Sequence, residues 1–81
     1  MRSKSEIGSA VDRILTTLLQ VSEDNVATCS RQTVTNWTSL MHIEIFFALE
    51  EEFGVRFEED SMAFADSRSD LVDAVEDALR Q

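Results

Sequence analysis

The sequence predicts an all-α fold: a four-helix bundle with three main helices, one short helix and a long first loop. Apolar residues recur at helical spacing near residues 4–20, 39–53 and 67–80, and a turn or two of helix fits near residues 59–65. The chain has no proline and two glycines, so the usual interruptions of long helices are scarce. Its 81 residues, 43% of them hydrophobic, suit one core, and we expect a single domain spanning residues 1–81.

The first helix is amphipathic. Its polar face carries residues such as Asp12 and Arg13, and its apolar positions are Ile7, Val11, Ile14, Leu15, Leu18 and Leu19. Ser3 is followed three residues later by Glu6, the spacing of a capping box, in which each side chain accepts a hydrogen bond from the other residue's backbone N–H. The box predicts that the helix begins near Lys4.

A long connector follows, from residue 21 to residue 37. It is rich in Ser, Thr, Asn and Asp and shows no periodicity, and a structureless loop of that length is unusual in so small a domain. Val26, Val34 and Trp37 are spaced along it, so we expect these side chains to anchor the connector to the core. An indole has a large apolar area, which favours a core position for Trp37.

The second helix is the most apolar segment. Its large apolar residues cannot share one narrow stripe, so we expect a central helix that is contacted on more than one side; they are Leu40, Ile43, Phe46, Phe47, Leu49 and Phe53. The remaining positions form an acidic outward face made of Met41, Glu44, Ala48, Glu51 and Glu52. Gly54 is expected to end the helix in the left-handed conformation. Residues 55–57 then read as extended, and Ser67 with Asp70 predicts a capping box for the last helix.

Composition narrows the classes of function. Sixteen acidic residues against seven basic ones give a net charge of −9, which repels nucleic acid and anionic membranes and favours basic protein partners. No apolar run is long enough to span a membrane. Cys29 is the only cysteine, so neither an intramolecular disulfide nor a cysteine metal cluster can form. These features predict a cytoplasmic protein, which we expect to be a monomer.

The sequence offers little for catalysis or metal binding. His42 is the single histidine and has no partner at metal-ligand spacing. The run Glu50, Glu51 and Glu52 points in three directions on a helix and cannot converge on one cation. The carboxylates at Asp60, Asp66 and Asp70 lack the spacing of a calcium loop. We therefore expect no metal site and no enzyme.

Ser39 stands where the connector turns into the second helix. Its hydroxyl is expected at or beside the first free backbone N–H groups of that helix. A phosphate attached there would accept from these groups and lie at the positive end of the helix dipole. The competing interpretation is that Thr38 or Ser39 is simply the helix N-cap.

The segment from Ser39 to Val55, SLMHIEIFFALEEEFGV, closely resembles the second helix of acyl carrier proteins, in which a DSL motif precedes ALEEEFG or a near variant. The resemblance implies an acyl-carrier-like bundle whose Ser39 receives 4′-phosphopantetheine from a phosphopantetheinyl transferase. The arm would hold fatty acyl, polyketide or aminoacyl intermediates as thioesters, and partner enzymes would supply the catalytic groups. The chain would then be a carrier and not an enzyme.

Two departures from the family pattern fall where the transferase would dock. Thr38 replaces the motif aspartate, and Met41 stands where an acidic residue is often found. They imply either a specialised set of partners or a relative that is no longer modified. Glu44, Glu50 and Glu51 remain to meet the basic surfaces of the transferase and of acyl-transferring or synthase enzymes. The alternative function is an unmodified helical adaptor that docks basic partners through its acidic face.

The resemblance also raises the question of whether the bundle encloses the carried acyl group in an apolar cavity. Phe46, Phe47 and Met62 could frame an apolar cavity or simply fill the core, and we expect core packing.

Overall fold

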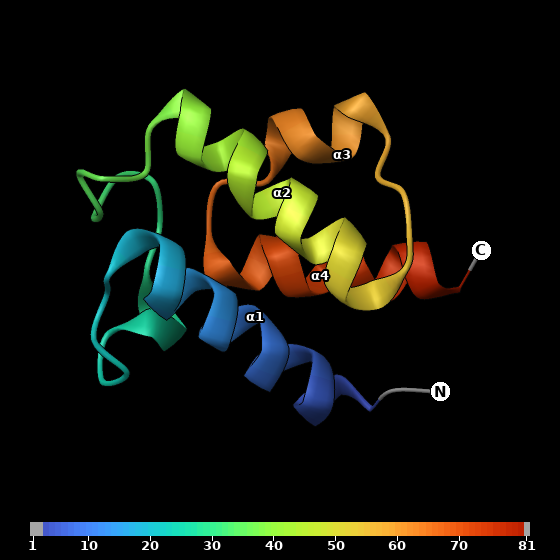
Figure 1. The fold of residues 1–81 in the computed structure, drawn as a ribbon, viewed down its shortest axis with the longest axis horizontal. Helices are drawn as coiled ribbons and strands as arrows, with labels where there is room; N and C mark the ends of the chain where they lie inside the picture. Colours follow the sequence, from blue (N-terminus) through green and yellow to red (C-terminus); the bar gives the residue numbers. More distant parts are fainter. Residues whose placement is uncertain (1–2, 81) are drawn as a thin grey trace.

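The computed structural model describes residues 3–80 and confirms the all-α fold. Its helices are α1 (Lys4–Leu19), the 3-10 helix η1 (Val26–Thr28), α2 (Ser39–Phe53), α3 (Glu59–Phe64) and α4 (Arg68–Leu79), and the described residues contain no strand (Figure 1). The predicted bounds agree with the observed ones to within one residue at each end. Helices α1, α2 and α4 contact one another, while the short α3 lies beside α2 (Figure 1).

The ends of the main helices follow the predicted local signals. Ser3 Oγ accepts the Glu6 N–H at 3.2 Å, and the Glu6 carboxylate accepts the Ser3 N–H at 3.2 Å, so the capping box is complete. Gly54 ends α2 with a φ of 65°, the left-handed conformation that a glycine adopts without strain. At α4 the Ser67 hydroxyl accepts the Asp70 N–H at 3.2 Å. The Asp70 carboxylate, however, accepts from the N–H of Asp66 at 3.0 Å, one residue before the position that the box predicts.

The core lies between α1, α2 and α4. Its largest fully buried side chains are Val11, Leu15, Leu19, Ile45, Phe46, Leu49, Leu71 and Val75. Burial of apolar area is the main term that stabilises such a bundle.

The connector is anchored as predicted, and also in a way that the sequence did not reveal. Val26 and Trp37 are buried and Val34 is half-buried against the core. In addition, the connector pairs with the residues before α4. The Arg31 N–H donates to the Asp66 carbonyl at 2.8 Å, and the Arg68 N–H donates to the Cys29 carbonyl at 3.1 Å.

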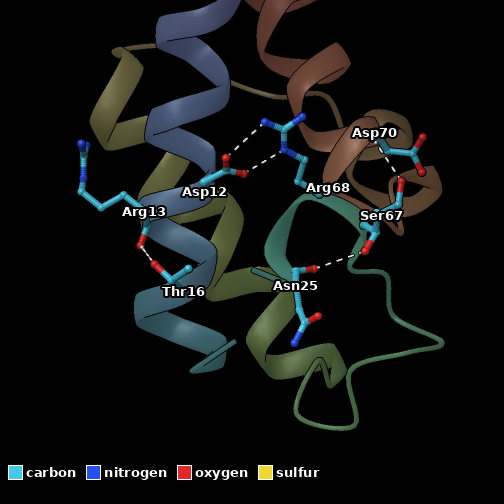
Figure 2. Close-up of polar contacts among 8 residues, drawn as sticks. Asp12, Arg13, Thr16, Asn25, Ser67, Arg68 and Asp70 are labelled. Carbon is cyan, nitrogen blue, oxygen red and sulfur yellow. Dashed lines mark hydrogen bonds and ion pairs between the residues drawn. The ribbon is translucent and has the colours of Figure 1, made fainter. Parts of the chain in front are cut away.

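An ion pair joins α1 to the start of α4 (Figure 2). Arg68 Nε donates to Asp12 Oδ1 at 2.8 Å and its Nη2 donates to Oδ2 at 3.3 Å, a two-point contact between half-buried side chains. Gly8 lies one turn earlier on α1, and a Cβ there would come within 2.8 Å of Arg68 Nη2. The absence of a side chain at Gly8 therefore lets the guanidinium approach the helix.

We expected other elements to contact α2 on more than one side. This prediction is wrong for the stripe of α2 that carries three of its apolar residues. Leu40, Ile43 and Phe47 are 67%, 44% and 62% exposed. Helices α1 and α4 cover the opposite stripe of α2, where Ile45, Phe46 and Leu49 are buried. The short α3, which buries no residue, is too small to cover the rest. Phe47 is therefore not part of the core, while Phe46 is.

Candidate functional site

Ser39 is the first residue of α2, and it is not the residue that caps the helix. Thr38 is the N-cap: its Oγ1 accepts the Met41 N–H at 3.2 Å. Ser39 itself is exposed, and its hydroxyl makes no hydrogen bond within residues 3–80. Capping by Thr38 thus leaves the Ser39 hydroxyl available for another role.

Two backbone donors lie beside that hydroxyl. In the described part of the chain the N–H groups of Ser39 and Leu40 have no acceptor, as expected for the first positions of a helix, while the Met41 N–H is taken by Thr38. These two donors and the positive end of the helix dipole favour an anion attached to or bound near Ser39.

A buried histidine lies one turn after Ser39. The indole Nε1–H of Trp37 donates to His42 Nδ1 at 3.0 Å, so Nδ1 must be an acceptor and the imidazole proton must sit on Nε2. That Nε2 donates to the Met62 carbonyl at 2.6 Å. Both ring nitrogens are thereby occupied by structural hydrogen bonds, and His42 is 8% exposed. In this arrangement the imidazole links Trp37 of the connector to Met62 of α3.

The predicted docking residues have different surroundings. Glu44 and Glu51 are exposed on one stripe of α2, with the half-buried Ala48 between them. The carboxylate of Glu50 accepts the N–H of Phe57 at 3.0 Å, so this residue also has a structural role. Met41 is half-buried against the core.

The three consecutive glutamates diverge, as predicted. Glu50 turns to the backbone of Phe57, Glu51 is exposed, and Glu52 forms an ion pair with Arg13 of α1 at 3.0 Å. No group of three or more His, Cys, Asp or Glu side chains within residues 3–80 is arranged to hold a metal ion.

Three apolar residues of α2 that we expected other helices to cover are exposed to solvent instead. We define the outer face of α2 as Leu40, Ile43, Glu44, Phe47 and Glu51, all of which are exposed. The three apolar residues are spaced by three and four positions and so line up along the helix. This spacing, distinct from that of the buried stripe, was the available signal that α2 has two apolar faces.

Cys29 is not a candidate nucleophile. The thiol is buried in the core, and desolvation by burial, followed by the charge of Asp12, raises its pKa. A raised pKa keeps the thiol protonated and unreactive.

Among the helices that the structure describes, none combines the length and the apolar character needed to cross a bilayer.

Comparison with known proteins supports the family resemblance over part of the chain. The chain matches no family profile. It is 49% identical over 41 residues to "Acyl carrier protein 3" of Ralstonia nicotianae (strain ATCC BAA-1114 / GMI1000), a match that covers 51% of this chain and 47% of that relative. The chain thus spans about half the length of the curated relative it matches. The predicted resemblance to the acyl carrier protein family is confirmed by this match.

Proposed function

We propose that this chain, as a relative of the acyl carrier proteins, holds acyl or aminoacyl intermediates as thioesters on a 4′-phosphopantetheine arm attached to Ser39. The observation that carries the proposal is the exposed hydroxyl of Ser39 at the first position of α2. It forms no hydrogen bond within residues 3–80, and Thr38 caps the helix in its place. In this role the chain is a carrier, and partner enzymes perform the chemistry.

The residues at the start of α2 fit a phosphodiester. The Ser39 hydroxyl would form the ester bond, and the N–H groups of Ser39 and Leu40 would donate to the phosphate oxygens. The helix dipole favours the negative charge at this end. When bound, the arm supplies a terminal thiol on which the acyl group is carried.

The outer face of α2 is suited to partners with an apolar contact surface bordered by basic residues. Glu44 and Glu51 would attract and orient such a partner, while Leu40, Ile43 and Phe47 would lose their contact with water on docking. The net charge of −9 opposes contact with a second copy of this chain or with another acidic protein. A phosphopantetheinyl transferase and acyl-transferring or synthase enzymes with basic surfaces are therefore the proposed partners.

Mass spectrometry tests the attachment site. Incubation with coenzyme A and a phosphopantetheinyl transferase should add one phosphopantetheine to the chain, and Ser39→Ala should abolish the addition. Ser69→Ala is the matched control, because Ser69 is also an exposed serine in the first turn of a helix, and this variant should be modified normally.

The same experiment examines the adaptor alternative. Thr38 and Met41, which depart from the family pattern, favour it, as does an apolar outer face that could bind a partner without any arm. If several transferases, the cognate one included, leave Ser39 unmodified, and a partner binds Ser39→Ala as well as the unaltered chain, the adaptor function replaces the carrier function.

A further inference from the structure

We propose that His42 is a latch that holds α3 against α2, and that α3 opens as a flap beside Ser39 when the hydrogen bond from His42 to Met62 is broken. The inference goes beyond the carrier function, and it does not depend on whether Ser39 is modified. It rests on the weak packing of α3, on the two hydrogen bonds of the imidazole and on the anchored segments at each end of α3.

Helix α3 has little packing of its own. It has six residues, none of them buried, and its largest side chain, Phe64, is 82% exposed. Only Met62 packs partly against the core. A helix this short is unstable by itself in water, so its place in the fold depends on the few contacts that it makes.

The hydrogen bond from His42 is the polar contact that ties the middle of α3 to α2. His42 Nε2 donates to the carbonyl of Met62 at 2.6 Å, and the imidazole is 8% exposed. If α3 moves away, the Nε2–H loses this acceptor and must bond to water instead. Exchanging a hydrogen bond within the protein for one to water is net unfavourable, so this bond disfavours the open arrangement.

The hydrogen bond at His42 Nδ1 fixes the imidazole tautomer that can donate to Met62. Trp37 is 4% exposed, and its indole has only a donor to offer to His42 Nδ1. A shift of the imidazole proton to Nδ1 would put two N–H groups against each other, so the proton stays on Nε2, where it can reach Met62. The ring of Phe46 packs edge-on against the imidazole at 5.1 Å between centroids and restricts its tilt.

Both ends of α3 are held independently of the latch. Before α3, the Phe57 N–H donates to Glu50, and the Phe57 ring packs against Phe46 at 5.0 Å between centroids. After α3, Ala65 is buried and the Asp66 carbonyl accepts from Arg31. Movement would therefore be confined to residues 58–64. Because His42 lies three positions after Ser39, an open flap would uncover α2 within one turn of that serine.

Two substitutions at His42 separate the two hydrogen bonds. In His42→Asn the shorter side chain places an amide oxygen near the position of Nδ1, which keeps an acceptor for Trp37 but removes the donor to Met62. In His42→Gln the longer side chain places an amide N–H near the position of Nε2, which keeps that donor. Solvent exchange of the backbone N–H groups of residues 62–64, measured by NMR, reports the opening of α3.

We expect exchange at residues 62–64 to be about 2- to 10-fold faster in His42→Asn than in the unaltered chain, the range that follows from the loss of one neutral hydrogen bond. His42→Gln should restore slow exchange, and the amides of α1 and α4 should be unchanged in both variants. The indole N–H signal of Trp37, the single tryptophan, reports whether its own hydrogen bond is kept.

Three results would overturn the latch. One is an exchange rate in His42→Asn equal to that of the unaltered chain, and another is equal acceleration in the Gln and Asn variants. The third is acceleration across α1 and α4 as large as that in α3, because the bond would then stabilise the whole bundle and not the flap.

Discussion

Phe47 offers the sharpest test of the outer face of α2. Its side chain is 62% exposed, and a phenylalanine buries about 150 Å² or more in full contact, so a docked partner can cover about 90 Å² of it. At ~25 cal/mol per Å², that area contributes at most about 2 kcal/mol to binding. Phe47→Ala should therefore lower kcat/KM for modification of Ser39 by up to about 30-fold. Because the residue is mostly exposed, stability should change by less than about 0.5 kcal/mol.

The assay pairs this variant with a matched control. Phe64→Ala removes the other exposed phenylalanine, which is on α3 and outside the outer face of α2, and its kcat/KM should stay at the unaltered value. Rates are measured with the cognate transferase, and thermal melting is measured on the same samples. If the transferase modifies Ser39 in Phe47→Ala as fast as in the unaltered chain, the transferase does not cover the Phe47 side chain. A large drop in melting temperature would instead show that Phe47 packs in the core in solution.

Two further predictions concern charge. Reversal of both exposed acids, Glu44→Lys with Glu51→Lys, should slow acyl transfer to or from a cognate enzyme, and the effect should be larger at low than at high ionic strength. The melting temperature should change little, because exposed ion pairs contribute only about 0.2–1 kcal/mol each. A transfer rate that equals that of the unaltered chain at every salt concentration would remove these residues from the docking surface. The second prediction concerns Asp70, whose pKa is lowered chiefly by the hydrogen bond from the Asp66 N–H. The folded pKa then lies below the unfolded one, so the stabilisation is complete above the unfolded pKa and is lost as the pH falls through the folded pKa. Thermal melts at a series of acidic pH values should therefore show a shallower acid-induced loss of stability in Asp70→Asn than in the unaltered chain, and parallel curves would contradict this.

Local signals account for what the sequence predicted well. The helix bounds follow from side chains that act within one turn, such as the Ser3 and Glu6 capping box and the left-handed Gly54. The exposed position of Ser39 at the start of α2 is local in the same sense, because it depends on the helix N-terminus and on Thr38 beside it. The position of Ser39 at the helix start could therefore be predicted from local signals, whereas its choice as an attachment site came from the family resemblance.

What the sequence did not predict depends on distant neighbours. Leu40, Ile43 and Phe47 are apolar enough for a core, and only the placement of α1, α4 and the short α3 decides that they remain in water. The contact of Glu50 with the Phe57 N–H requires the chain to reverse after Gly54. Periodicity along one helix carries no information about which of its faces another helix will cover.

The pairing of the connector with the start of α4 has a consequence for the order in which this molecule is completed during synthesis. Arg31 and Cys29 bond to Asp66 and Arg68, residues more than thirty positions later in the chain. A chain made from its N-terminus has finished α1 and α2 well before these partners leave the ribosome. The segment that leads into Ser39 therefore gains its final anchors only once the start of α4 has emerged. In this protein the surroundings of the candidate attachment site mature together with α4.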